Sequence, residues 1–337
     1  MSILRRLLKR FRSDQRGAVA TLVALALVPV TAVTAVGVDS GRVWVERQRI
    51  QTAAEAAAMA AAGVWANTGT ACDANALLKV RENAGSEATW TCSTTGSRYD
   101  GVITVAASKT VSAVFGRIIG HQSTTVSSTA SVLVGAVSSA TGVRPNALCA
   151  ANTALTAWKA GGYSSSATYR IGVDQSPDGD EHDHGHPSSP VTGAQVCDPV
   201  AGNWSMVDYD GGSHRIVDSQ RWIDDGYEGD VEVGHNYSGD PGVPAPSLDF
   251  NRILGQTIVI PVYDTVTGTG SNAVYHVSSF VGIQIVSTTL SGPVSGRNVT
   301  VRFKPVALSN AGCSHGAAAS GVVTWRPCSL DGKGTCS

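Results

Sequence analysis

Three histidines alternate with other polar residues in the part of this 337-residue chain that is richest in chemically reactive side chains. They are His182, His184 and His186, within DGDEHDHGHP. In an extended strand all three imidazoles would point to one face, where they could hold zinc or copper. The stretch has no β-branched or aromatic residue to hold it as a strand, and a flexible polar loop with adventitious metal affinity explains it better. We therefore predict no functional metal site.

Carboxylates are concentrated in the same region. From Asp174 to Asp249 the chain carries 16 of its 26 acidic residues, against two basic residues, Arg215 and Arg221. Solvated, mutually repelling loops explain this run. The alternative is a loop that binds Ca²⁺, which prefers oxygen ligands, although the EF-hand spacing is absent. The formal net charge of −1 lacks the basic footprint of a nucleic-acid-binding protein, so we expect no nucleic-acid partner.

The sequence lacks the common enzyme motifs. It has no P-loop, no HExxH, no GxSxG and no GxGxxG fingerprint, and no spacing joins its Ser, His and Asp residues into a triad. We predict no catalytic residues, no cofactor-binding residues and no cofactor, and we expect that the protein is not an enzyme. A secreted metal-dependent hydrolase is a third class of function to be tested.

Seven cysteines indicate disulfides rather than a metal site, because none of them forms a CxxC pair. Disulfides are the natural use of cysteine outside the cytoplasm. We expect bonds between Cys72 and Cys92 and between Cys149 and Cys197. Cys313 would then pair with one of the two last cysteines, Cys328 or Cys336, which leaves one thiol over.

The N-terminus has the pattern of a membrane anchor. Residues 1–17 carry six basic side chains and one acid, and residues 18–38 are 21 residues without a charge. A helix of that length spans about 30 Å, the thickness of the hydrocarbon core. The positive-inside rule places the N-terminus in the cytoplasm and residues 39–337 outside, in a single-pass protein of the cell membrane. The alternative is a cleavable signal peptide with a small-residue site around Val33–Ala35.

Residues 39–66 continue this helix with an alanine-rich extension. Small and apolar residues recur on one face at helical spacing, and the predicted helix-packing residues are Ile50, Ala54, Ala57, Ala61 and Val64. Small side chains let another backbone approach closely. The face could pack on the protein's own globular part or on neighbouring subunits, and the two interpretations are compatible.

The rest of the chain indicates an α+β fold. Residues 67–137 are expected to form a small α+β unit, with helices at 73–83 and 112–120 and a strand from Tyr99. Residues 138–146 are a polar, turn-rich linker. Residues 147–337 are expected to form a β-rich antiparallel extracytoplasmic domain with acidic loops and helices at 148–159 and near 218–224.

The N-terminal segment resembles Flp (Tad) pilus-assembly proteins of the TadE/TadG-like family. The similar positions are Arg16-Gly17 before the apolar span, Asp39-Ser40-Gly41-Arg42 after it, a Gln-containing basic turn at Gln48–Gln51, and the run Ala53–Ala62. Residues 110–132 are also similar to the family's Phe-containing helix and the strand that follows it. The resemblance implies a pilin-like helix in an envelope protein that works with a type IV-related machine.

One position departs from the family's processed pilins. These have Glu five residues after the cleaved Gly, and after Gly17 that position is Leu22. The departure favours an accessory component kept as a full-length anchor. The sequence therefore predicts a non-catalytic, membrane-anchored component of a Flp-type pilus assembly or secretion system, with other pilus or pseudopilin subunits and the Tad machinery as partners. The alternative is a surface adhesin or ligand-binding module that uses the acidic outer domain.

Overall fold

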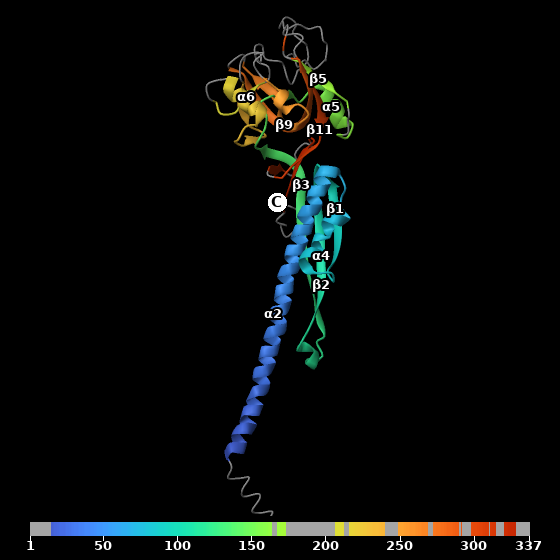
Figure 1. Cartoon of the computed structure of the whole chain (residues 1–337), viewed down its shortest axis with the longest axis vertical. Coiled ribbons are helices and arrows are strands. Elements are labelled where there is room, and N and C mark those ends of the chain that lie inside the picture. Colours follow the sequence, from blue (N-terminus) through green and yellow to red (C-terminus); the bar gives the residue numbers. More distant parts are fainter. Residues whose placement is uncertain are drawn as a thin grey trace, which may run out of the picture. The chain divides into compact units, whose positions relative to one another are not determined.

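The computed structural model describes residues 15–163, 167–172, 206–211, 216–239, 249–268, 272–289, 291, 298–309, 311–314 and 320–327. A long N-terminal helix is followed by a β-rich region with two mixed sheets, so the expected α+β class is confirmed (Figure 1). The chain forms two compact units. The first comprises Met1–Ala57, Leu77–Cys92 and Val105–Ala130, and the second Ala58–Ala76, Ser93–Thr104 and Ser131–Ser337.

Helix α2 runs without interruption from Gln15 to Thr68, with Pro29 inside it. Among the described residues it is the one helix long and apolar enough to cross a membrane, and its apolar side chains between Val19 and Val38 are exposed. The hydroxyls of Thr31 and Thr34 donate to carbonyls one turn back in the same helix. These polar side chains therefore need no water in an apolar surrounding.

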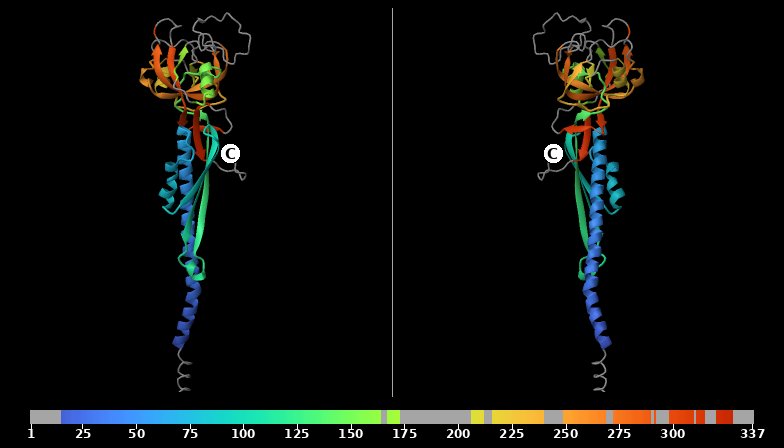
Figure 2. Two further views of the ribbon diagram at one scale, coloured as in Figure 1. Left: turned by 90° about the vertical axis from the view of Figure 1, so that its right-hand side faces the viewer. Right: turned by 90° about the vertical axis from the view of Figure 1, so that its left-hand side faces the viewer.

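Three strands and short helices follow α2 along the chain. Their bounds are α3 Ala74–Leu77, α4 Lys79–Ala84, β1 Thr89–Ser97, β2 Asp100–Ser112, the 3₁₀ helix η1 Gly116–Ile119 and β3 Ser123–Ala140. The inward residues of β2, from Ile103 to Ala107, alternate with less buried ones, as expected for a strand with one covered face. Two views of the ribbon show β2 and β3 running alongside α2 (Figure 2).

Both seven-stranded sheets are mixed and mostly antiparallel. The first has the order β1-β2-β3-β14-β12, and β13 and β7 also pair with β3; the later strands are β7 Val231–Glu232, β12 Val306–Leu308, β13 Gly312–Ser314 and β14 Val322–Pro327. The second has the order β4-β9-β10-β11-β5, with β8 on β10 and β6 on β8. Its strands are β4 Leu148–Cys149, β5 Tyr169–Gly172, β6 Val207–Asp208, β8 Asn236–Gly239, β9 Thr257–Thr267, β10 Val274–Thr289 and β11 Asn298–Lys304.

The second sheet is buried on both faces, which is why its central strands are apolar almost throughout. Along β9, Ile258, Ile260 and Val262 belong to one core, with α5 Thr153–Ala160 and η2 Asn251–Ile253. Val259 and Tyr263 belong to the other, together with Trp222 of α6 Ile216–Asp224. Successive side chains of a strand point to opposite faces of the sheet. A strand in which both of these alternating sets are apolar is typical of a sheet covered on both sides.

Three local expectations need correction. The helix expected at 148–159 begins only at Thr153, because Leu148 and Cys149 pair in parallel with β9 and Asn152 caps α5 by accepting from the Leu155 amide. The helix expected at 112–120 is shortened to the 3₁₀ turn η1. β3 continues to Ala140, so the expected 138–146 linker begins inside a strand. The division into residues 67–137 and 147–337 stays a prediction.

The cysteines follow the expected pairing in part. Cys72 and Cys92 form a disulfide. Cys149 is also disulfide-bonded, and its expected partner Cys197 lies outside the described residues, as do Cys328 and Cys336. The expected bridge from Cys313 is wrong in this structure. Cys313 is a buried free thiol in β13, a strand that pairs with β3.

Loss of the Cys72–Cys92 bond should destabilise the protein. A closed loop of this length restricts the unfolded chain by an amount worth about 3 kcal/mol in the chain-entropy model. We expect Cys72→Ser with Cys92→Ser to lower the denaturant midpoint of the full chain in detergent. Cys313→Ser, which breaks no disulfide, is the control for cysteine removal. Equal midpoints for the double variant and the parent under non-reducing conditions would contradict the bond.

Candidate functional site: the junction between helix α2 and the β2–β3 hairpin

One face of α2 is covered by the chain itself. Its fully buried residues are Ile50, Ala53, Ala54, Ala57, Ala58, Ala61 and Ala62, and Val64 is half-buried. They recur at three- and four-residue spacing, which places them on one side of a helix. Of the two interpretations of this stripe, the burial favours packing on the protein's own chain. A contact between these residues and a neighbouring subunit stays a prediction.

A carboxylate joins the helix to the turn between β2 and β3. Asp39 accepts three backbone hydrogen bonds, from the amides of Val114 at 2.9 Å, Phe115 at 3.1 Å and Gly116 at 2.7 Å. These bonds hold the pKa of Asp39 below its ordinary value of 3.8, and the bond from Val114 has the largest effect. The turn is thus attached to α2 through a charged acceptor that prefers to stay ionised.

Glycine allows the turn to approach this carboxylate. A Cβ on Gly116 would lie 3.0 Å from the carbonyl oxygen of His121 and 3.3 Å from Oδ2 of Asp39. Gly120 ends η1 with a φ of 90°, a left-handed conformation that other residues rarely adopt. The local sequence therefore builds a compact turn whose backbone amides face the helix.

A second ionic contact lies two helical turns beyond Asp39. Glu46 pairs with Lys109 of β2 at 2.9 Å, and the Lys109 ammonium also donates to the carbonyl of Ala84 at the end of α4. Both side chains are mostly buried, and the bond from Lys109 is the main reason that the pKa of Glu46 lies below 4.5. Between the two carboxylates, Arg42 donates to the carbonyl of Ser112. Asp39, Arg42 and Glu46 with their partners form what we call the helix–hairpin clamp.

The helix–hairpin clamp is suited to holding elements together rather than to a reaction. Its carboxylates accept from amides and an ammonium, and no nucleophile lies beside a base in it. The described part of the chain has no group of three His, Cys, Asp or Glu that could hold a metal. His182, His184 and His186 lie outside the described residues, so the prediction about them is untested. In the second unit, His276 of β10 and Asp264 of the neighbouring strand β9 pair at 2.7 Å, and both side chains are partly exposed.

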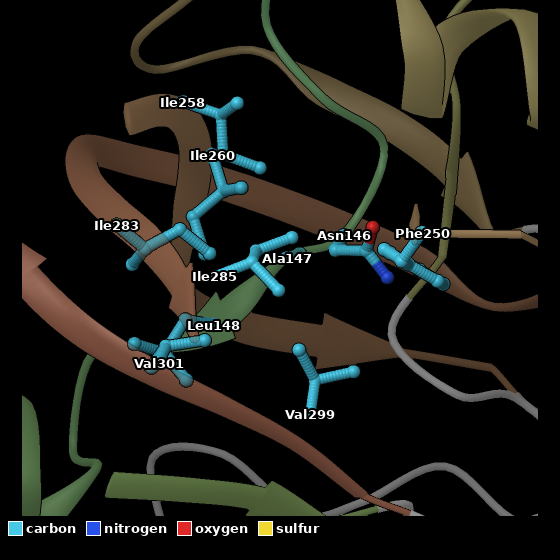
Figure 3. A pocket seen from close by; sticks show the side chains of 10 residues that line it. All are labelled: Asn146, Ala147, Leu148, Phe250, Ile258, Ile260, Ile283, Ile285, Val299 and Val301. Atoms are coloured by element: carbon cyan, nitrogen blue, oxygen red, sulfur yellow. The ribbon is translucent and has the colours of Figure 1, made fainter. Parts of the chain in front are cut away.

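A small cavity in the second unit does not resemble a ligand site. Figure 3 shows it beneath β9, β10 and β11, with apolar side chains pointing inward and Asn146 as its polar lining residue. Its volume is about 30 Å³. Drug-sized ligands occupy pockets of roughly 300–1,000 Å³. The space is a packing defect of the core around Ile260 and Val301.

Sequence reasoning missed half of the helix–hairpin clamp. The sequence indicates Asp39 only as a position similar to a family motif, and it predicts an i,i+4 pair between Arg42 and Glu46. In the structure Glu46 pairs instead with Lys109, which the sequence did not single out. Asp39 is the first charge after the apolar span, which was the available signal. Its partners lie 75 to 77 residues further along the chain, and a local pattern does not reveal them.

The comparisons with known proteins concern the same segment. Residues 17–64 match the family model described as putative Flp pilus-assembly TadE/G-like. No curated protein and no solved structure matches the chain. The match covers the apolar span, Asp39, Arg42, Glu46 and most of the buried stripe, so the helix side of the clamp falls within the segment that the family model describes.

Breaking the ion pair of the clamp should destabilise the first unit. Lys109→Met leaves Glu46 mostly buried without its main partner, and hydrogen bonds to charged groups are worth about 1.5–3 kcal/mol. We expect a loss of that order in the free energy of unfolding of the full chain in detergent. Glu46→Gln should cost a similar amount, and the double variant should cost less than the sum. Strictly additive losses would mean that the two side chains do not interact.

Asp39→Asn should loosen the turn around η1. The amide removes the charge and presents one oxygen where the carboxylate presents two, so we expect roughly tenfold faster hydrogen exchange in a peptide covering residues 113–121. The pKa of Asp39 is lower in the folded state than in the unfolded chain. Its contribution to the stability of the folded state is therefore complete above about pH 4 and is lost as the pH falls through the pKa of the folded state. Glu87→Gln, an exposed carboxylate in the same unit, is the control. Unchanged hydrogen exchange of residues 113–121 in the Asp39→Asn variant would show that Asp39 does not hold the turn.

Proposed function

We propose, from the match of residues 17–64 to the Flp pilus-assembly TadE/G-like family, that this chain is a non-catalytic, membrane-anchored component of a Flp-type pilus assembly or secretion system. The membrane location rests on the apolar span of α2. The single observation that carries the proposal is that the family segment is one uninterrupted helix, apolar and exposed at its start and buried by its own chain further on.

The proposed topology has the N-terminus in the cytoplasm. Six basic residues precede the span within residues 1–17, and loops rich in Lys and Arg remain on the cytoplasmic side. The disulfide between Cys72 and Cys92 supports an oxidising compartment for the region after the span. Both observations point the same way, although they come from opposite sides of the span.

The uncovered face of α2 is the surface that we propose for contact with other pilus subunits. Val45, Gln48, Gln51, Thr52 and Glu55 are exposed and lie opposite the buried stripe. Because the chain itself covers Ile50, Ala54, Ala57 and Ala61, a neighbouring helix can reach α2 from this side. An extended helix with one face covered and one open fits side-by-side packing of subunits.

An adhesin that uses the acidic outer domain is the second candidate function. It is favoured by the 16 acidic residues between Asp174 and Asp249. The two functions differ in what loss of the protein removes. An assembly component is needed for pili to form, whereas an adhesin is needed for attachment after they have formed.

Deletion of the chain in its native host is expected to abolish Flp-type pili on the cell surface, and expression of the full chain should restore them. A photo-crosslinking residue at Gln48, on the open face of α2, should then capture pilus or pseudopilin subunits. The same residue at Glu87, exposed in the same unit but away from α2, is the control position. Electron microscopy and sheared-fraction blots measure the pili.

Three results would decide against assembly. Normal pili in the deletion strain would exclude an essential assembly role. Normal pili with lost attachment would establish the adhesin. Equal crosslinking at Gln48 and Glu87 would remove the open face of α2 as the subunit contact.

A further inference from the structure

The turn between β2 and β3 exposes large apolar side chains. Val114 is 48% exposed, Phe115 41% and Ile118 83%, the last being the highest value among the large hydrophobic residues that the structure describes. Three such residues within five positions, on a turn of a folded unit, form a contiguous apolar tip. Exposed apolar patches of this kind indicate a surface that contacts something apolar.

The clamp fixes where this tip lies relative to the apolar span. Asp39 binds the amides of Val114, Phe115 and Gly116, and it directly follows the uncharged residues 18–38. The tip therefore lies at the end of the span that leads into the folded part. Figures 1 and 2 show the η1 turn beside the lower part of α2 from every side drawn.

The backbone of the tip is already paired. The amides of Val114, Phe115 and Gly116 donate to Asp39. Those of Ala113, Ile118, Gly120 and His121 donate to carbonyls within the turn. An unpaired backbone group costs several kcal/mol in an apolar medium, and a segment can enter one only when its polar groups are satisfied internally. This tip meets that requirement for the amides named.

We propose that the η1 tip inserts into the lipid surface at the C-terminal end of the α2 span, as a second membrane contact of the same chain. Phe115 and Ile118 would enter the boundary between headgroups and acyl chains. Arg117, which is exposed between them, would reach lipid phosphates. The occupant of the apolar tip is therefore lipid.

A tryptophan on α2 shortly after the end of the apolar span supports the same assignment. Trp44 is 62% exposed and lies five residues beyond Asp39, which is about 7.5 Å along a helix axis. Tryptophan is enriched at this depth of membrane proteins because one end of its ring is apolar and the other polar. The inference rests on the membrane anchoring of the chain and not on its role in pili.

The experiment measures the depth of residue 118 directly. The full chain, with a genetically encoded fluorescent amino acid at Ile118, is reconstituted in vesicles of phosphatidylethanolamine and phosphatidylglycerol at 3:1. Lipids with a nitroxide on the acyl chain are added as quenchers. We expect at least roughly threefold stronger quenching at position 118 than at Thr95, which is exposed in β1.

A variant within the tip tests the apolar contact. Phe115→Asp should reduce quenching at position 118 toward the value at Thr95, whereas Ser86→Asp, exposed elsewhere in the same unit, should leave it unchanged. Hydrogen exchange in strand β2 shows that the Phe115→Asp chain is folded. Equal quenching at 118 and 95 in the parent chain would overturn the proposal. So would a photo-crosslinker at 118 that captures a protein and no lipid in native membranes. Either failure leaves the deletion and crosslinking results on pili unaffected.

Discussion

Small side chains on the covered face of α2 are the constraint on which the first unit depends. Ala53, Ala54 and Ala57 let the backbone of neighbouring elements approach the helix axis closely. The same rule continues into the second unit, where a Cβ on Gly63 would lie 3.3 Å from the ring of Trp325. Close approach has a cost, since each alanine buries little apolar area and leaves little hydrophobic stabilisation per residue.

The clamp supplies what the alanine face lacks. Asp39, Arg42 and Glu46 are spaced by three and four residues, so they share one side of α2 with the stripe. Alanines permit several axial offsets between a helix and a sheet, because one small side chain resembles the next. Polar contacts with specific partners on β2 and the η1 turn select one offset. The register of hairpin against helix, and hence the level of the apolar tip, follows from these bonds.

The features that could be predicted from the sequence are those carried by local patterns. The apolar span, the period of the stripe and the alternation of β2 all repeat over a few residues and survive in the structure. The family segment was predicted by resemblance and matches residues 17–64. The partners of Asp39 lie on a segment 75 to 77 residues further along the chain, and no local pattern encodes them.

The misjudged turn shows why local reasoning failed there. Residues 112–120 have an amphipathic pattern that predicts a helix. The amides of Val114 to Gly116, which would begin such a helix, donate instead to the carboxylate of Asp39. The 3₁₀ turn that remains starts at Gly116 and ends at Gly120. A tertiary contact thus shortens the element and turns its apolar residues outward, and the same contact produces the exposed tip.

An off-axis membrane contact has a consequence that a single helix lacks. A lone transmembrane helix can rotate about its axis, and its rotation and tilt are set by packing and by anchors at the interface. In the proposed arrangement the η1 tip contacts lipid to one side of α2, on the side of the covered face. Because the hairpin is fixed to α2, tilting α2 away from the side of the tip would lift Ile118 out of the lipid, so the tip opposes that tilt. The open face with Gln48 and Gln51 then points sideways from α2 and away from the tip, where a neighbouring subunit in the same membrane can reach it. Lipid contact on one face and subunit contact on the other are therefore parts of one orientation of the helix.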